Sequence, residues 1–390
     1  MPNASSFTFS APCPEEVEEM DRVLEQALTF AVGTMAPWTN MIGHPNMRVV
    51  RSDGRIVAGL GVIPFGHWLG GRVVPAGGVT AVGVAPDQRG SGVGLWMLTR
   101  MLEEQRALGV PILTLYPATT AFYRRAGFER AAQRTIYELP LAALATRDHA
   151  LEAVPVAPER YDLIRELYAR RAARSAGFIE RPDFLWRRVL TRPEKPTYAF
   201  AALRDGTPEG YVVFEHTTWG EPLLVRDIIA LTPDAGRRLL MLLAGHRSMI
   251  ETVRFPGAPH DPLLFLLPEQ KHKVSSAIDL MLRILDVPAA LEARGYAPGA
   301  AGELHLEVVD ELLPANSGRF VLRVADGVGR VERGGRGRIR LHIRELAALY
   351  TGYYTPLELR QVSALEADDA ELADAGRIFA GPRPWLPDMF

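Results

Sequence analysis

The chain has 390 residues, of which 47 % are hydrophobic, and its 44 Lys and Arg nearly balance its 46 Asp and Glu. This length suggests two or three ordinary globular domains, and the net charge of −2 gives no reason to expect binding to nucleic acid or to an anionic membrane. The single cysteine, Cys13, excludes an internal disulfide framework. Residues 1–6 lack the features of a signal peptide and no apolar run is long enough to span a membrane, so we expect a cytoplasmic protein.

The N-terminal part of the chain predicts alternating helices and strands. A strand is expected at 7–10, a helix at 14–30 with glutamates in its first turn, and a core-packed loop or short helix at 38–42. Strands are then expected at 47–50 and 56–63, joined by a turn at 52–54, and at 72–75, 79–85, 111–116 and 135–138. Further helices are expected from about residue 93 and at 121–128.

The most informative segment joins the strand at 79–85 to the helix near residue 93. It reads Arg-Gly-Ser-Gly-Val-Gly at 89–94, and a glycine-rich turn before a helix offers backbone N–H groups to a diphosphate. No lysine closes the loop as in a P-loop, and the glycine spacing differs from Gly-x-Gly-x-x-Gly. The pattern Arg-x-x-Gly-x-Gly instead resembles the coenzyme A pyrophosphate loop of the GNAT N-acetyltransferases. A surface turn that is rich in glycine for packing reasons is the alternative.

A second unit begins near residue 150 and echoes the first. The expected strands at 200–206 and 210–214 resemble the first hairpin, and a strand at 225–231 is again followed by a helix, at 237–244. The turn between them, at 235–238, has one glycine and no Gly-x-Gly. We therefore expect a duplicated fold that lacks the coenzyme site, with a chance resemblance between two α/β segments as the alternative.

A third unit is expected from residue 281, with a short helix at 288–294, strands at 303–309, 318–324 and 336–343, and a helix at 344–351. A basic run is expected to be the solvated face of an edge strand, with an anion or partner surface as the alternative. It comprises Arg330, Arg333, Arg336, Arg338, Arg340 and Arg344. The chain ends on an aromatic, Phe390, preceded by Trp385, which predicts that the tail inserts into the protein together with its terminal carboxylate.

The glycine loop, the degenerate second unit and the segment VPAALEARGY at 287–296 together resemble the enhanced intracellular survival family of N-acetyltransferases. This resemblance implies an α/β (α+β) protein with two tandem GNAT folds, at 1–145 and 146–280, and a sterol-carrier-protein-2-like domain at 281–390. It also implies acetyl-CoA as co-substrate without a metal, primary amines of aminoglycosides or lysine side chains as acceptors, and a homohexamer.

The resemblance also implies roles for individual residues. Tyr123 corresponds to the general acid of the family, and the terminal carboxylate of Phe390 corresponds to its general base. The coenzyme contacts correspond to Val82, Gly83, Val84, Arg89, Gly90, Ser91, Gly92, Val93, Gly94, Leu95, Ala118 and Thr119. Met389 stands where an acidic residue can occur in the family, which makes the amine pocket less acidic.

Two other functions remain open from the sequence. The first is an acetyltransferase for another acceptor, such as a polyamine, a small metabolite or a protein N-terminus. The second is a non-enzymatic lipid-binding or scaffold protein that uses the third unit. Metal catalysis and a Ser-His-Asp hydrolase are not expected, because the chain has neither a His-x-x-x-His pair nor a Gly-x-Ser-x-Gly turn.

Overall fold

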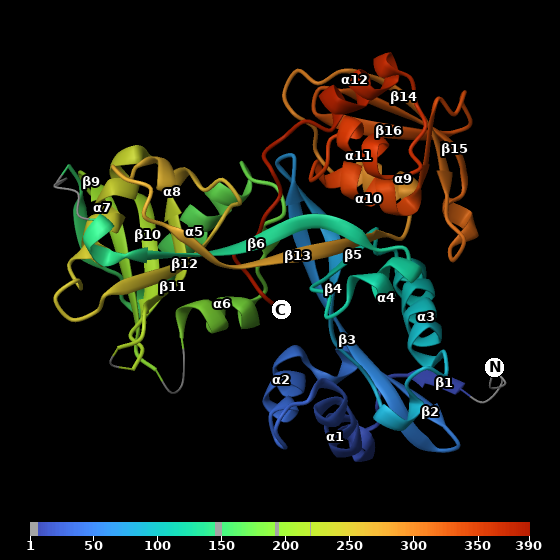
Figure 1. The fold of residues 1–390 in the computed structure, drawn as a ribbon, viewed down its shortest axis with the longest axis horizontal. Helices are drawn as coiled ribbons and strands as arrows, with labels where there is room; N and C mark the ends of the chain where they lie inside the picture. The colour runs from blue at the N-terminus through green and yellow to red at the C-terminus, as the bar shows by residue number, and fades with distance from the viewer. Residues whose placement is uncertain (1–6, 145–149, 192–194, 219) are drawn as a thin grey trace.

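The computed structural model describes residues 7–144, 150–191, 195–218 and 220–390 (Figure 1). The expected absence of a signal peptide at residues 1–6 and the expected boundary between residues 145 and 146 lie outside these ranges. Figure 1 shows a first unit in blue and cyan, a second in green and yellow, and a third in orange and red. Within the described residues, no helix combines the length and the apolar character needed to cross a membrane.

The first unit contains the elements from β1 to β6. They are β1 (Phe7–Ser10), α1 (Val17–Leu28), α2 (Met35–Ile42), β2 (Met47–Ser52), β3 (Arg55–Leu69), β4 (Arg72–Val84), α3 (Val93–Ala107), β5 (Ile112–Leu115), α4 (Thr120–Arg125) and β6 (Glu129–Pro140). The expected hairpin is confirmed, because Asp53 and Gly54 have the positive φ values of 50° and 77° that a two-residue turn requires. Helix α1 ends earlier than expected, since Thr29 takes a left-handed φ of 59°.

The strands expected at 72–75 and 79–85 are one continuous strand, β4. The glycines between them, Gly77 and Gly78, pair with Pro64 and Ile63 of β3, so the ladder is not interrupted. A Cβ atom on Gly77 would lie 2.5 Å from Leu113 and one on Gly78 would lie 2.4 Å from Phe65, so these glycines allow close packing. Sequence reasoning mistook them for a strand break.

The second unit repeats the order of the first. It contains β7 (Glu152–Pro155), α5 (Tyr161–Ala172), β8 (Ile179–Glu180), α6 (Asp183–Leu190), β9 (Thr197–Arg204), β10 (Thr207–Glu215), β11 (Leu223–Ala230), α7 (Pro233–Ala244), β12 (Thr252–Gly257), α8 (Pro262–Phe265) and β13 (Lys273–Ile284). Strand β11 is antiparallel to β10 and parallel to β12, as β4 is antiparallel to β3 and parallel to β5.

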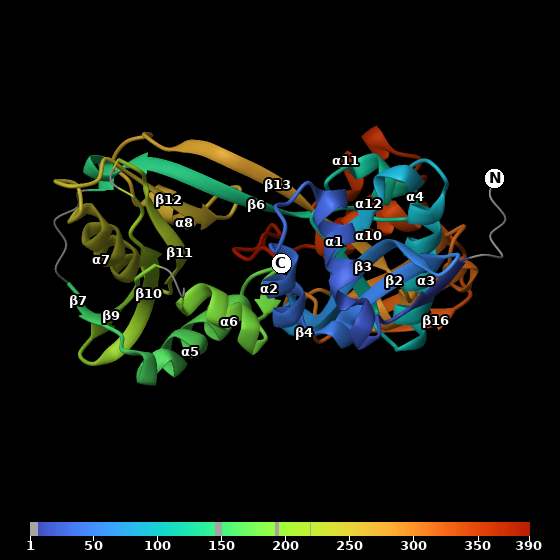
Figure 2. The ribbon, with the colours of Figure 1, turned by 90° about the horizontal axis from the view of Figure 1, so that it is seen from below.

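The two units share one sheet with the strand order β1-β2-β3-β4-β5-β13-β6-β12-β11-β10-β9-β7. Strand β13, from the end of the second unit, lies between β5 and β6 of the first. Strand β6 in turn pairs with both β13 and β12, and Figure 2 shows β6 and β13 running side by side between the two halves. The expected division at residues 280 and 281 would cut through β13. We propose instead that the third unit begins after Ile284.

The third unit packs helices on a sheet with the order β16-β15-β14-β17. It contains α9 (Val287–Ala293), β14 (Gly302–Val309), β15 (Gly318–Ala325), β16 (Val328–Arg333), β17 (Ile339–His342), α10 (Ile343–Thr351), α11 (Pro356–Val362) and α12 (Asp369–Ile378). The strand expected at 336–343 is shorter than predicted, since Gly334, Gly335 and Gly337 take positive φ values before it. Strand β16, α11 and α12 were not predicted.

The basic run does not lie on one strand, so the expected single solvated face is wrong in that respect. Arg330 and Arg333 belong to β16 and Arg340 belongs to β17, which are the two opposite edges of the small sheet. Arg338 and Arg340 form ion pairs with Glu371 and Glu366. Neighbouring carboxylates therefore balance part of the positive charge of the basic run, for which the sequence offered an anion or partner surface as the alternative.

Candidate active site

The candidate active site begins where β4 and β5 separate. These parallel strands pair only from Ala76–Ile112 to Gly78–Thr114, so among the described strands β4 has no partner on that side from Val79 to Val84. A bulge lies in the same stretch: Gly61 pairs with Thr80, but Gly59 pairs with Gly83, which leaves one extra residue on β4. Ala81, within the bulge, has a φ of 50°. Val82, Gly83 and Val84 therefore lie on an open strand edge that can hydrogen-bond an extended ligand.

The glycine loop follows directly and leads into α3. Gly90 and Gly92 have φ values of 80° and 94°, and a Cβ atom on either would meet nothing within 4 Å, so the space beside the loop is open. Gly94 is different, because a Cβ atom there would lie 3.2 Å from Phe122. It lets the first turn of α3 pack closely.

The start of α3 has the features of an anion site. No side chain caps the helix at Gly92, and no acidic residue lies in its first turn. The Ser91 hydroxyl donates to the carbonyl of Gln88 at 2.7 Å, which holds the loop in place. The Val93 N–H donates to the Ser91 hydroxyl at 3.3 Å. The next N–H groups, of Gly94 and Leu95, lie at the positive end of a 15-residue helix and fit a diphosphate, which is the group that coenzyme A would bring.

The remaining expected coenzyme residues lie around this loop. The Arg89 guanidinium donates to the carbonyl of Ala27 at 2.8 Å, so it ties the loop to the end of α1. Ala118 and Thr119 are exposed in the segment between β5 and α4, and Thr119 is the N-cap residue of α4. The structure thus places the loop and the open edge of β4 in one continuous stretch, with Ala118 and Thr119 after the end of the neighbouring strand β5.

Tyr123 lies on α4 and is buried. Its ring packs against Phe122 and Phe128, with centroid distances of 5.2 and 6.0 Å. Burial raises the pKa of its hydroxyl to about 12, so the phenol remains protonated at neutral pH. None of the described residues accepts or donates a hydrogen bond at this hydroxyl, which leaves it available to a ligand.

The C-terminal tail lies between the two halves of the protein (Figure 2). Hydrogen bonds from side chains fix its backbone. Three consecutive carbonyls accept hydrogen bonds from side chains. Arg134 Nε donates to Pro387 at 2.9 Å, the Tyr116 hydroxyl to Asp388 at 2.5 Å, and Arg188 Nη1 to Met389 at 2.8 Å. The donors come from both GNAT-like units, so the end of the chain has a fixed position.

The side chain of Asp388 anchors the same tail. Arg181, whose side chain is fully buried, donates through Nε to the Asp388 carboxylate at 2.9 and 3.0 Å and through Nη1 to Asp227 at 2.5 Å. Its guanidinium also lies 3.9 Å from the centre of the Tyr168 ring. Burial raises the pKa of Asp388, and the charge of Arg181 opposes that rise.

The ring of Phe390 lies against β4 at the point where β4 and β5 begin to separate. It contacts Phe65 and Tyr116 at centroid distances of 5.0 and 5.5 Å. A Cβ atom on Gly78 would lie 2.8 Å from the Phe390 ring, so only glycine fits there. The expected insertion of the aromatic tail is confirmed.

Tyr123 and Phe390 approach the separated strands from different sides. Tyr123 belongs to the apolar cluster that α3 covers, whereas Phe390 belongs to the cluster that α1 and α2 cover. The structure shows no direct contact between the two residues.

A pocket of about 350 Å³ opens beside the tail. Its walls include Pro387, Asp388 and Met389 together with Leu185 and Val225. Four arginines also line it, namely Arg134, Arg188, Arg226 and Arg254. Sequence reasoning missed these arginines and Arg181, since nothing local to them points to the tail. Asp388 was the one signal, because an acidic residue within an inserted aromatic tail needs a buried cation.

Comparison with known proteins agrees with this geometry. Residues 12–131 and 177–284 each match an acetyltransferase (GNAT) domain, and residues 287–387 match a sterol carrier protein domain. The chain is 32 % identical over 376 residues to an uncharacterized N-acetyltransferase of Streptomyces griseus, covering 87 % of this chain and 89 % of that one. It is 29 % identical over 375 residues to the N-acetyltransferase Eis of Mycobacterium tuberculosis, covering 86 % and 90 %.

A solved structure gives the same result for the fold. A GCN5-related N-acetyltransferase from Anabaena variabilis superposes with a TM-score of 0.94 over 98 % of this chain and 100 % of that chain, at 36 % identity. The expected order of two GNAT folds and a sterol-carrier-protein-like unit is therefore confirmed, and so is the duplication that the echo between the first two units predicted.

Proposed function

We propose that this chain, which belongs to the enhanced intracellular survival family of GCN5-related N-acetyltransferases, transfers acetyl from acetyl-CoA to a primary amine where β4 and β5 separate. The chain is an acyltransferase, so the alternative of a non-enzymatic scaffold is set aside. The observation that carries the proposed site is the continuous open edge of β4 followed by the glycine loop before α3. The second unit has no such loop at the start of α7.

The proposed coenzyme site uses the backbone more than side chains. Val82, Gly83 and Val84 offer the open edge to the pantetheine arm, and the loop from Arg89 to Leu95 offers N–H groups to the diphosphate. Ala118 and Thr119 lie after β5, where they complete the coenzyme contacts. Acetyl-CoA brings an activated thioester, and a backbone N–H on the β4 edge stabilises the negative charge that develops on its carbonyl oxygen.

We propose that the terminal carboxylate of Phe390 is the general base and that the Tyr123 hydroxyl assists the departure of the thiol. The terminal carboxylate of Phe390 accepts a proton from the ammonium of the acceptor, and the amine so formed attacks the thioester carbon. As the C–S bond breaks, the Tyr123 hydroxyl donates a hydrogen bond to the departing sulfur, which takes up the second proton that the nitrogen loses. A pKa of about 12 keeps Tyr123 protonated until it acts. Since that pKa lies well above the value of about 8.5 for a free thiol, Tyr123 acts mainly by hydrogen-bonding the sulfur as charge develops on it.

The acceptor is proposed to be an aminoglycoside or a lysine side chain, and the pocket beside the tail favours the second. Four arginines line that pocket. Arg254 pairs with Glu138 at 2.5 Å and Arg226 lies 3.7 Å from Glu215, whereas Arg134 donates to the uncharged carbonyl of Pro387. A cationic wall repels an acceptor with several ammonium groups more than one with a single group.

Mass spectrometry tests the activity and the acceptor together. The protein is incubated with acetyl-CoA and either a polyamine aminoglycoside or a peptide with one lysine, and the acetyl groups added to each are counted. We expect the peptide to gain one acetyl group faster than the aminoglycoside gains any. If the protein binds acetyl-CoA but acetylates neither substrate, both proposed acceptors are refuted and the acceptor must be a different amine.

Assembly and location belong to the same proposal. The family resemblance supports a cytoplasmic homohexamer, and light scattering after size exclusion should give a mass near six times 43.0 kDa. A mass of one or two chains would contradict the proposed assembly without affecting the proposed chemistry.

A further inference from the structure

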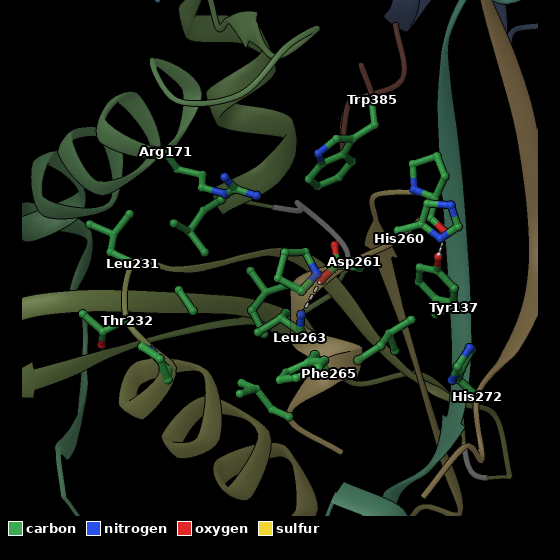
Figure 3. A pocket seen from close by; sticks show the side chains of 18 of the residues that line it. Tyr137, Arg171, Leu231, Thr232, His260, Asp261, Leu263, Phe265, His272 and Trp385 are labelled. Atoms are coloured by element: carbon green, nitrogen blue, oxygen red, sulfur yellow. Dashed lines mark hydrogen bonds between the residues drawn. The ribbon is translucent and has the colours of Figure 1, made fainter. Parts of the chain in front are cut away.

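The second unit contains a pocket of about 920 Å³ that lies away from the glycine loop and the tail pocket (Figure 3). It is formed by the end of β11, the start of α7, the α8 segment and the beginning of β13. Most of its wall is apolar, with Ile228, Leu231, Leu264, Phe265, Val274 and Trp385 among the lining residues. This size and lining are typical of a site for a small ligand.

The pocket corresponds in topology to the coenzyme site of the first unit. Strand β11 pairs with the parallel strand β12 only at Leu223 and Leu224, so β11 continues without that partner, as β4 does beyond Gly78. Helix α7 then begins at Pro233, as α3 begins after the glycine loop. The duplicated fold has therefore kept the separation between two parallel strands.

The position at the start of α7 that corresponds to the proposed diphosphate site at the start of α3 is, however, occupied by side chains of the protein. A Cβ atom on Gly236, in the first turn of α7, would lie 2.5 Å from Leu266 and 3.2 Å from Leu263. Leucine side chains from α8 and the residue after it thus cover the start of α7. A nucleotide diphosphate has no room there, but the apolar part of the pocket remains.

Among the described residues that line this pocket, Arg171 is the one arginine or lysine. Arg171 extends from α5 toward the centre, and Trp385 extends toward it from the other side (Figure 3). Among the described residues, none forms a hydrogen bond or ion pair with the Arg171 side chain. The charge of Asp261 acts on Arg171, but the Asp261 carboxylate already accepts hydrogen bonds from the backbone N–H groups of Ala258 and Leu263 at 2.8 and 2.9 Å.

We propose that this pocket binds an aliphatic carboxylate, with the carboxylate on Arg171 and the chain along Leu231, Leu264 and Phe265. A planar guanidinium suits a planar carboxylate, which can accept two parallel hydrogen bonds from it. Phe265 is 92 % exposed, so an apolar chain would also cover a large aromatic surface that water now contacts. The site is separate from the proposed acetyl transfer.

The ligand would touch the tail that carries the proposed base. Trp385 lines the pocket, and its backbone N–H donates to the carbonyl of Ala176 at 3.0 Å. Five residues further on, the chain ends at Phe390. A ligand in the pocket would therefore contact the segment that leads to the terminal carboxylate.

Isothermal titration calorimetry with octanoate tests the proposal on the full-length protein, without acetyl transfer. We expect saturable binding of octanoate, weaker binding of octan-1-ol and none of octyltrimethylammonium. Arg171→Met should weaken octanoate binding by about tenfold and leave octan-1-ol unchanged, while the exposed Arg174→Met behaves as wild type. Equal binding of octanoate and octyltrimethylammonium, or no effect of Arg171→Met, would overturn the proposal.

A second pair of variants tests the location. Val274 lines the pocket and is 56 % exposed, so Val274→Trp should place an indole in the pocket without disturbing the core and should weaken octanoate binding. Val309→Trp, at a strand position of 49 % exposure in the third unit, is the matched control and should bind octanoate normally. Octanoate binding that is unchanged in Val274→Trp, or octanoate that saturating acetyl-CoA displaces, would place the ligand elsewhere and refute this site.

Discussion

Arg181→Met should destabilise the protein and release the tail. The Arg181 side chain has no solvent exposure and lies between the carboxylates of Asp227 and Asp388. Methionine of similar length would keep much of the contact with Tyr168 and Trp186 but would leave two buried carboxylates without their cation. Removal of one partner from a buried ion pair costs about 3–5 kcal/mol, which is a large part of the about 5–15 kcal/mol that stabilises a typical domain.

The effect on catalysis follows from the position of Asp388, two residues before the terminal carboxylate. A shift of about 1 Å in a catalytic group, here the terminal carboxylate, can slow the catalysed reaction by about 100-fold. We therefore expect kcat to fall by at least that factor, with little change in the dissociation constant of acetyl-CoA, whose proposed site lies along β4 and α3. The matched control is Arg165→Met, which removes an exposed arginine that pairs with Asp183 and lies over the same Trp186 ring. It should cost less than about 1 kcal/mol.

The free energy of unfolding, measured in urea at two pH values, distinguishes the effect of the missing positive charge from the effect of changed packing. A buried carboxylate without a cation has a raised pKa, because burial disfavours its ionised form. The loss of folding stability in the variant is therefore largest at pH values above that pKa, where the carboxylates are ionised in the unfolded chain and in the folded protein. The stability deficit of Arg181→Met should therefore shrink between pH 7 and pH 5. A deficit below about 1 kcal/mol, or one that is equal at both pH values, would refute the reasoning.

Four further changes test the site and the fold. Tyr123→Phe should lower kcat by about 100-fold or more with unchanged binding of acetyl-CoA and little change in Tm, because its hydroxyl has no partner among the described residues. One glycine added after Phe390 should lower kcat similarly by moving the carboxylate, and full activity would exclude it as the base. Gly92→Ala, at a φ of 94°, should weaken binding of acetyl-CoA in calorimetry through about 1–2 kcal/mol of strain. Burial lowers the pKa of His67 to about 4, so the folded state resists a proton that the unfolded chain accepts below about 6.5. Stability should fall by up to about 3.4 kcal/mol as the pH drops from 6.5 to 4, and His67→Gln should remove that slope.

The local features of the fold could be predicted because each depends on a few neighbouring residues. Asp53 and Gly54 predict their turn, and Gly90 and Gly92 predict a loop with positive φ values before a helix. The inserted tail was predicted from its aromatic residues alone. In each case the physical requirement and the residues that meet it lie within one short segment.

The contacts that assemble the site could not be predicted, because their partners are distant in the sequence. Arg181 and Asp388 are 207 positions apart, and Tyr116 reaches the tail across 272 positions. The sequence around Arg181 looks like any polar turn before a helix. Strand β16 was missed for a different reason: its arginines read as a charge run, although Val328 and Val331 pair with Ala325 and Leu322 of β15 in a regular ladder.

The position of β13 determines when the large sheet can be completed during synthesis. A ribosome completes β5 long before it reaches Lys273–Ile284, so the nascent first unit exposes an unpaired strand edge until β13 emerges and fills the gap between β5 and β6. Exposed strand edges promote association with other chains, and pairing between distant segments is slow. We therefore expect that the first unit does not mature alone, because its sheet is completed by β13, the last strand of the second unit. This dependence gives the second unit a role in biogenesis that would be lost if the enzyme were shortened to its first 145 residues.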